Sequence, residues 1–145
     1  MKQVHATTVH LTGKGVMLCG PSASGKSDLG LRLIEIGARL VADDRTNLTV
    51  SNNTIRASAP KELFGKMEVR GIGIITLEAI IETRLAMVIS LIDAVDMQRL
   101  PTLETTEILG VTLPLVRLCA FEASAPAKVR AALAQHSQLE TQQYE

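Results

Sequence analysis

One segment, Gly20 to Ser27, constrains the fold of this chain more than any other part of the sequence. It reads Gly-Pro-Ser-Ala-Ser-Gly-Lys-Ser and matches the pattern GxxxxGK[ST] in full. An apolar stretch, Val16 to Cys19, precedes it directly, and a helical pattern, Lys26 to Ile36, follows it. This order predicts a strand, a phosphate-binding loop and a helix. Backbone N–H groups of such a loop, together with the helix N-terminus, hold phosphate oxygens.

The side chains of this loop predict a nucleoside triphosphate and Mg²⁺ as ligands. Lys26 is expected to neutralise the β- and γ-phosphates, and the Ser27 hydroxyl is expected to bind Mg²⁺. The alternative, a turn rich in Gly and Ser that matches by chance, is disfavoured because strand, loop and helix agree. The residues expected to hold the nucleotide are Gly20, Pro21, Ser22, Ala23, Ser24, Gly25, Lys26 and Ser27.

The composition excludes several other kinds of protein. The chain has 145 residues, of which 46% are hydrophobic, and 15 Lys and Arg balance 15 Asp and Glu. Without a basic excess, it is not expected to hold nucleic acid by neutralising phosphates. Its apolar runs fall far short of the about 20 residues that a membrane-spanning helix needs. We therefore expect one compact cytoplasmic domain over residues 1–145, with no membrane or nucleic-acid partner.

The core is expected to consist of aliphatic side chains, because aromatic residues make up only 2% of the chain. Such a composition suits buried parallel strands covered by helices. Cys19 and Cys119 lie far apart in the sequence, inside apolar runs and without metal-ligand spacing. We expect both to be reduced thiols in the core.

Alternating and apolar runs predict further strands on both sides of the loop and helix. In chain order they are Val4–Leu11, Leu40–Ala42, Asn47–Val50, Thr54–Ala57, Leu85–Ile92 and Val111–Ala120. Asn52 and Asn53 predict a hairpin turn between two of them. Gly37 is a natural end for the first helix, and Ser124 a possible N-cap for a last one. Pro114 suggests an edge or a break in its strand.

Glycines also interrupt the strand-like segment Met67 to Ile75, where they suggest a close backbone approach or a bulge. Glu68 and Arg70 stand in this segment. A carboxylate there is suited to Mg²⁺ and a guanidinium to phosphate, but their spacing is equally that of the solvated face of a strand.

Two carboxylates follow the strand that comes after the first helix. Asp43 and Asp44 stand where side chains reach the nucleotide across the carboxyl edge of a sheet. One of them is suited to act as general base toward an incoming hydroxyl. A solvated turn or a helix cap explains the spacing equally well.

Taken together, these segments resemble the catalytic domain of the HPr kinase/phosphorylase family, from His5 to about Pro114. The segment Gly15 to Gly20 leading into the loop, Arg39 to Asp44, and Glu68-Val69-Arg70-Gly71-Ile72-Gly73-Ile74-Ile75 carry the resemblance. The last looks like the signature of the family. The resemblance implies an α/β fold of the type shared with phosphoenolpyruvate carboxykinase, a mixed sheet with flanking helices, ATP and Mg²⁺ as ligands, and phosphorylation of a serine of the phosphocarrier HPr.

The resemblance also implies roles for individual residues. Asp44 corresponds to the residue that accepts the serine proton and returns it in the reverse, phosphate-dependent reaction, and His5 lies at the active-site histidine. Lys26 corresponds to the catalytic lysine, and Ser27 and Glu68 fall at the Mg²⁺-binding positions. Arg99, in Asp96-Met97-Gln98-Arg99-Leu100, is the best counterpart of the arginine of the family.

The sequence departs from the family in ways that bear on its function. Full-length relatives carry an amino-terminal domain that is not present in these residues, and Val111 to Arg117 matches the segment tied to dephosphorylation only loosely. The resemblance therefore implies kinase activity more directly than the reverse reaction. It also implies the hexamer that is typical of the family. Two alternatives stay open: a kinase of a small hydroxylated molecule, and a nucleotide-sensing module that transfers no phosphate.

Overall fold

The computed structural model describes the backbone of residues 1–144 and the side chains of residues 1–136. Its elements, in chain order, are β1 (Lys2–Val4), β2 (Ala6–Leu11), β3 (Lys14–Cys19), α1 (Lys26–Glu35), β4 (Arg39–Ala42), β5 (Thr46–Ser51), β6 (Thr54–Ser58), η1 (Lys61–Leu63), β7 (Lys66–Val69), β8 (Gly73–Thr76), β9 (Glu82–Leu91), η2 (Ala94–Asp96), β10 (Glu104–Ile108), β11 (Val111–Leu118) and α2 (Ala125–Tyr144).

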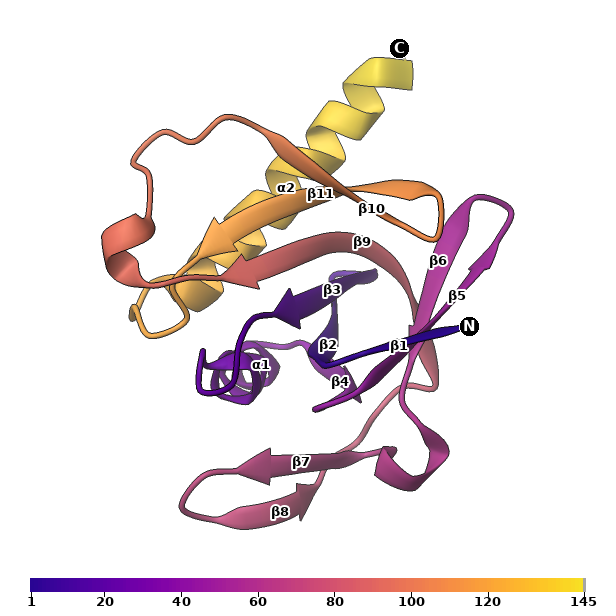
Figure 1. Cartoon of the computed structure of the whole chain (residues 1–145), viewed down its shortest axis with the longest axis vertical. Coiled ribbons are helices and arrows are strands. Elements are labelled where there is room, and N and C mark those ends of the chain that lie inside the picture. Colours follow the sequence, from indigo (N-terminus) through magenta and orange to yellow (C-terminus); the bar gives the residue numbers. More distant parts are fainter. Residues whose placement is uncertain (145) are drawn as a thin grey trace.

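Within the described backbone, nine strands form one mixed sheet, and β7 pairs only with β8 in a separate hairpin (Figure 1). The central strand β9 runs parallel to β3 on one side and to β11 on the other. Its first residues pair instead with β6, antiparallel. Strand β9 thus pairs with β6 at its start and with β3 and β11 along the rest of its length. The sheet bends along β9, so that β1, β5 and β6 form one arm of it (Figure 1).

Two apolar clusters fill the two faces of this bent sheet. One lies between the sheet and the helices, and joins Leu18 of β3 to Leu29 of α1 and Val129 of α2. The other lies on the opposite face and includes Met17 of β3 and Leu48 of β5. Met17 and Leu18 point to opposite faces because side chains alternate along a strand. The fold class predicted from the sequence, an α/β fold with a mixed sheet and flanking helices, is confirmed.

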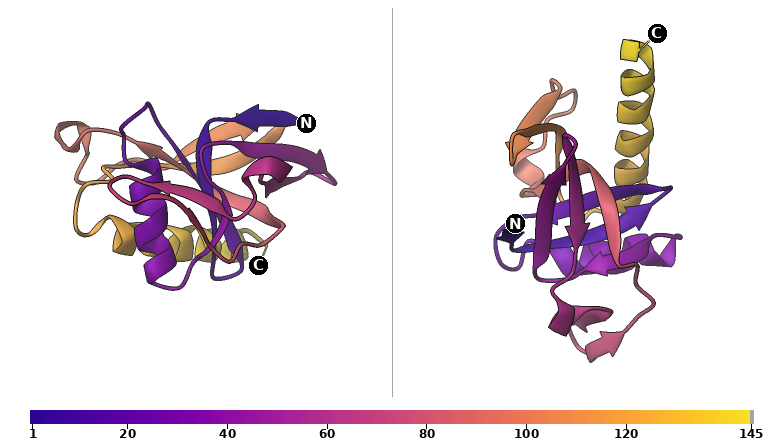
Figure 2. Two further views of the ribbon diagram at one scale, coloured as in Figure 1. Left: turned by 90° about the horizontal axis from the view of Figure 1, so that it is seen from below. Right: turned by 90° about the vertical axis from the view of Figure 1, so that its right-hand side faces the viewer.

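Both helices begin where the sequence patterns predict, and α1 also ends there. Gly37, at a φ of 112°, follows the cap residue of α1 and donates its N–H to the carbonyl of Ile34, as a left-handed glycine after a helix does. The carbonyl of Ser124 accepts the N–H of Lys128 at the start of α2. Figure 2 shows that the C-terminal part of α2 projects beyond the sheet. No helix in the described part of the chain is long and apolar enough to cross a membrane.

Other strand predictions need corrections. The strand predicted from Val4 to Leu11 is split at His5, because β1 pairs with β5 whereas β2 pairs with β3 and β4. The predicted hairpin is present, with Asn52 and Asn53 at φ angles of 51° and 58° in its turn. Pro114 interrupts nothing: β11 is continuous, and its pairing with β9 begins one residue later, at Leu115.

Candidate active site

The phosphate-binding loop connects the end of β3 to the start of α1, as its sequence predicts. Ala23 and Gly25 both have positive φ angles, of 65° and 96°. Alternation of left- and right-handed backbone turns successive N–H groups toward one concave side, which suits an anion. The Lys26 ammonium donates to the carbonyls of Gly20, at 2.7 Å, and Pro21, at 3.0 Å. Because an ammonium has three N–H bonds, these contacts leave one for a phosphate oxygen.

Asp43 holds three parts of the site together from a buried position. Only 4% of the residue is exposed. Its Oδ1 atom accepts hydrogen bonds from the Ser27 hydroxyl, at 2.6 Å, and from the Thr7 hydroxyl, at 2.8 Å. Its Oδ2 atom accepts the backbone N–H of Glu68, at 3.2 Å. One carboxylate thus links the first turn of α1, strand β2 and strand β7.

Asp44, the next residue, has an exposed side chain and an uncommon backbone. Its φ angle is 68°, and the N–H of Arg45 donates to the carbonyl of Asp43 at 2.8 Å. A hydrogen bond across two residues with a positive φ at the centre is the rare form of the γ-turn, which is strained in residues other than glycine. Strain of this kind collects at functional sites. The turn places Asp44 in the cleft while Asp43 points into the protein.

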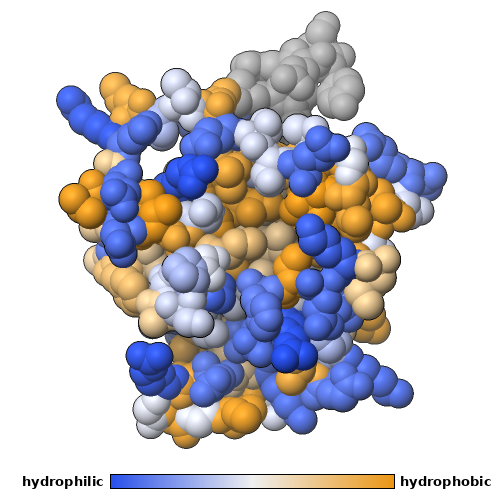
Figure 3. Space-filling model, viewed as in Figure 1, coloured by the Kyte–Doolittle hydropathy of each residue, from blue (hydrophilic) through white to orange (hydrophobic). Residues whose placement is uncertain are grey.

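The β7–β8 hairpin forms the wall opposite the phosphate-binding loop. Together they enclose a cleft of about 790 Å³. Its lining includes Lys26 and Ser27 from α1, Asp44, and Glu68 and Arg70 from the hairpin. In Figure 3 apolar side chains lie at the surface over the lower, hairpin end of the molecule, where Ile72 and Ile74 are about three-quarters exposed.

The glycines of this hairpin have a role that differs from the predicted one. A side-chain carbon added at Gly71 or Gly73 would meet no atom within 4 Å, so neither marks a close backbone approach. They have positive φ angles instead, of 89° and 115°. The N–H of Ile72 donates to the carbonyl of Val69 at 2.9 Å, which closes the turn. Glycine is needed there because the turn requires a left-handed residue.

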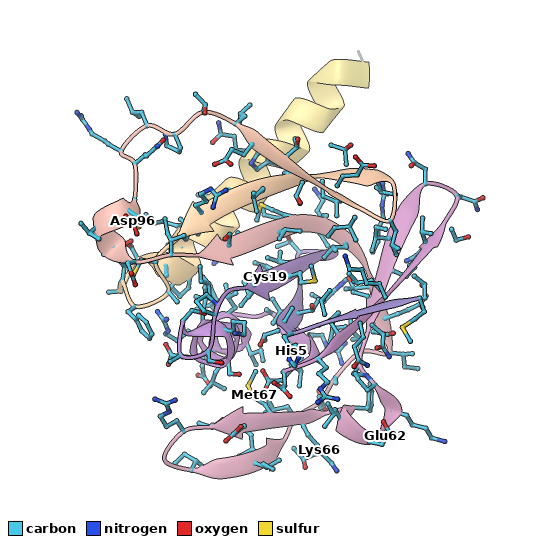
Figure 4. All side chains as sticks on the ribbon, viewed as in Figure 1. His5, Cys19, Glu62, Lys66, Met67 and Asp96 are labelled. Carbon is cyan, nitrogen blue, oxygen red and sulfur yellow. The ribbon has the colours of Figure 1, made fainter. Side chains whose placement is uncertain are left out.

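His5 and Arg99 do not line the cleft of the described chain. His5 is exposed at the junction of β1 and β2, and the N–H of Ala6 next to it donates to the carbonyl of Asp44 at 3.1 Å. This hydrogen bond joins the residue after His5 to the turn at Asp44. Figure 4 shows it on the side of β3 that faces Met67 of the hairpin.

Arg99 is exposed in the segment between η2 and β10. That segment starts at the same edge of the sheet as the phosphate-binding loop, because β3 and β9 run parallel and both end there. In Figure 4 the labelled Asp96, near Arg99 in the chain, lies on the opposite side of α1 from the hairpin. The structure therefore brings Lys26, Ser27, Asp44 and Glu68 together at the cleft, and leaves Arg99 outside it.

The donors at the cleft fit a magnesium ion that is bound with phosphates. No group of three His, Cys, Asp or Glu side chains in the described part of the chain is placed to hold a metal alone. Mg²⁺ in nucleotide sites commonly takes one or two protein oxygens and completes its shell with phosphate and water. The Ser27 hydroxyl beside Asp43, and Glu68 across the cleft, offer such oxygens.

Burial also affects the cysteine at the start of this loop. Cys119 is buried, whereas Cys19 is half-buried and packs against the apolar cluster that contains Met17. Both are free thiols at the core, as predicted. Burial raises the pKa of the Cys19 thiol, and the positive charge of Lys26 opposes that shift. The neutral thiol is therefore the favoured form of Cys19.

The sequence did not show which of the two adjacent aspartates is buried, and it did not point to Phe121. Phe121 lines the cleft and is 67% exposed. It follows β11 by a few residues, and only the pairing of β11 with β9, and of β9 with β3, brings it to the phosphate-binding loop. The isolated Asp-Asp pair at the end of an apolar strand was the available signal for Asp43.

Comparisons with known proteins identify the family of the chain. The family described as HPr Serine kinase C-terminal domain matches residues 1–145. HPr kinase/phosphorylase of Prosthecochloris aestuarii is 36% identical over 129 residues, which are 81% of this chain and 38% of that protein. The Lactobacillus acidophilus protein of the same name is 37% identical over 127 residues, 79% of this chain and 39% of that protein. The chain thus spans about two fifths of the length of these curated relatives.

A solved structure, that of the Hpr(Ser) kinase/phosphatase from Coxiella burnetii, superimposes on this chain with a TM-score of 0.84. The two sequences are 27% identical, and the match covers 98% of this chain and 99% of the other. The overall fold of the chain is therefore a known one. The chain belongs to the HPr serine kinase family and corresponds to its C-terminal domain.

Proposed function

We propose that residues 1–145 form the catalytic domain of an ATP-dependent kinase that phosphorylates a serine of HPr, a phosphocarrier of the bacterial phosphotransferase system. The observation that carries this proposal is the cleft, where the Lys26 loop faces Asp44 and Glu68. A nucleotide-sensing module has no need of a carboxylate at the mouth of a phosphate site. The family of the chain supports HPr as the acceptor.

In the proposed reaction Asp44 accepts the proton of the acceptor hydroxyl as its oxygen attacks the γ-phosphorus. The bond from that phosphorus to the bridging oxygen breaks, and ADP leaves with the electron pair. Lys26 and the N–H groups of the loop stabilise the charge on the transferring group, because positioning and charge supply most of the rate in phosphoryl transfer. Ser27 and Glu68 would hold Mg²⁺, which would supply further charge neutralisation at the phosphates.

The same residues serve the reverse reaction. An oxygen of inorganic phosphate attacks the phosphorus of phosphoserine, and the bond from that phosphorus to the serine oxygen breaks. Pyrophosphate forms, and the serine oxygen leaves with the electron pair and takes a proton from Asp44. His5 stands beside the Asp44 turn through Ala6, and we assign it to the same active site. We assign Arg99 to the transferring phosphate as well, which requires the segment that follows η2 to move toward the loop.

The proposal also includes the surroundings in which the enzyme works. We place it in the cytoplasm, where HPr and ATP are found. Six copies of the chain are expected to assemble, as in the family. Exposed apolar residues in and after η2, Val95, Leu100 and Leu103, offer surface for such contacts.

Intact-mass spectrometry of HPr tests the proposal. Purified HPr from the same organism is incubated with the chain and Mg-ATP, and then with excess phosphate. We expect HPr to gain one phosphoryl group on serine, and phosphate to remove it with release of pyrophosphate. Lys26→Ala is the control and is expected to lose both activities. A kinase that phosphorylates HPr without reversal would limit the proposal to its forward half.

ATP binding without any gain of mass on HPr would contradict the proposal. In that case the acceptor would be a small hydroxylated molecule, or the chain would be a nucleotide sensor. Retention of either activity by Lys26→Ala would contradict the role of the loop.

A further inference from the structure

Phe121 is an exposed aromatic residue in a chain that has almost none. The sequence contains two Phe, one Tyr and no Trp. Burying a side chain of this size stabilises a fold by about 1.5–3 kcal/mol. Phe121 nevertheless stays 67% exposed, and it lines the cleft beside the phosphate-binding loop. A ligand in the cleft therefore reaches the ring.

The ring stands against the loop at the N-terminus of α1. A side-chain carbon placed on Gly25 would lie 3.2 Å from Cε1 of Phe121 and 3.3 Å from Cζ. Both atoms belong to the outer end of the ring. Asp28 and Leu31, in the first two turns of α1, line the same cleft. The ring thus borders the phosphate-binding loop beside the N-terminus of α1.

The backbone on both sides of Phe121 is tied to the helices. The Arg32 guanidinium donates to the carbonyl of Ala120 and, at 3.2 Å, to the carbonyl of Glu122. Arg32 is itself paired with Asp28 at 2.8 Å. Glu122 is paired in turn with Lys128 of α2, also at 2.8 Å. These contacts fix the loop before any ligand arrives, so that binding orders little additional chain.

We infer that Phe121 is the platform on which the base of the nucleotide stacks. This inference rests on the proposed function, because it assumes that a nucleotide occupies the cleft. An aromatic ring next to a phosphate site offers a surface for stacking. A base can stack on this ring, whereas a triphosphate group cannot. Stacking tolerates different bases because every base has a π face. The site therefore favours purine over pyrimidine nucleotides by ring area and discriminates weakly between adenine and guanine.

The test compares a nucleotide with an inorganic ligand that lacks the base. Isothermal titration calorimetry measures the affinity of Mg-ATP and of Mg-tripolyphosphate, without any acceptor protein. Removing a stacking ring weakens base binding by about 5- to 150-fold. We expect Phe121→Ala to lose ATP affinity by such a factor and to keep its affinity for tripolyphosphate. Phe64→Ala is the matched control, since Phe64 is 43% exposed and does not line the cleft.

A second variant uses the absence of tryptophan from the sequence. Phe121→Trp places a single tryptophan at the platform. We expect ATP to quench its fluorescence and tripolyphosphate to leave it unchanged, with ATP affinity close to that of the wild type.

Equal loss of affinity for both ligands in Phe121→Ala would overturn the inference, because the ring would then only support the loop. Unchanged ATP affinity in Phe121→Ala would overturn it as well. If this variant bound ATP normally but phosphorylated HPr more slowly, the ring would contact HPr and not the base. The wild type distinguishes a failure of the proposed function. If it binds neither ligand, both proposals fail, whereas ATP binding no tighter than tripolyphosphate overturns only the platform.

Discussion

Asp43 and Asp44 are neighbours in the sequence with opposite surroundings. Asp43 is buried and accepts hydrogen bonds from Ser27, Thr7 and the backbone of Glu68. Asp44 is exposed in the cleft on a strained γ-turn. The same functional group therefore serves two purposes, since the buried one positions the loop hydroxyl and the exposed one is free to meet an acceptor.

The substitution Asp43→Asn is expected to destabilise the fold. Asparagine offers one uncharged acceptor oxygen where the carboxylate has two charged ones. Either the N–H of Glu68 or the Ser27 and Thr7 hydroxyls therefore lose the acceptor to which they donate. An unsatisfied buried donor costs about 1–3 kcal/mol. Urea denaturation should show a lower midpoint with an unchanged slope. Asp44→Asn, the same chemical change one residue on, is the control and should alter stability by no more than about 0.5 kcal/mol. Equal midpoints for the two variants would contradict the role of Asp43.

The chemistry of Cys19 gives a prediction about pH. Burial raises its pKa, so the unfolded chain loses the thiol proton before the folded one does. The contribution of Cys19 to stability is thus complete below the ordinary cysteine pKa and decreases as pH rises above it. The thiolate is the reactive form. In a Cys119→Ser background, alkylation by iodoacetamide at pH 8, followed by intact mass, should therefore be slower in the folded protein than in urea. Equal rates would contradict this account.

At the scale of elements, the sequence predicted those loops, turns and helix ends that depend on residues close together in the chain. The loop between β3 and α1, the end of α1 and the turn at Asn52 and Asn53 follow from glycine, asparagine and apolar spacing. The break at His5 does not, because it depends on pairing between β1 and β5, which are far apart in the chain. Phe121 reaches the site through pairing of the same long-range kind. The sequence did not show which of Asp43 and Asp44 faces the cleft, because the two differ in burial, which their spacing does not reveal.

Helix α1 approaches the sheet closely at one glycine. A side-chain carbon on Gly30 would lie 2.9 Å from Cγ2 of Thr7 and 3.4 Å from Cε of Met67. Alanine improves helix propensity by about 1 kcal/mol, but overpacking a core costs about 1–3 kcal/mol. Thr7 cannot turn away without giving up its hydrogen bond to Asp43. We expect the crowding to dominate and Gly30→Ala to lower the unfolding free energy.

A second substitution isolates the cause of that loss. Thr7→Ser removes the methyl group and keeps the hydroxyl, so the double variant Gly30→Ala with Thr7→Ser should recover stability relative to Gly30→Ala. Glu35→Ala, at an exposed position of the same helix, serves as the control for propensity. The idea fails if thermal unfolding shows Gly30→Ala to be as stable as the wild type.

At the scale of the whole molecule, the bent sheet explains how distant segments meet at one cleft. Strands β3, β9 and β11 run parallel and end at one edge, where the phosphate-binding loop, the segment that carries Arg99 and the Phe121 loop begin. The hairpin supplies the opposite wall from outside the sheet. The phosphate-binding loop, Phe121 and the hairpin are thus three borders of one cleft.

The most direct test of the account measures phosphoryl transfer and nucleotide affinity together in Asp44→Asn. Asparagine tolerates a positive φ as aspartate does, so the γ-turn should be kept. A general base contributes about 10²- to 10⁴-fold to such a rate. The account predicts that transfer from Mg-ATP to HPr falls by this factor while the dissociation constant of Mg-ATP stays the same. Transfer at a near-normal rate in this variant would contradict it.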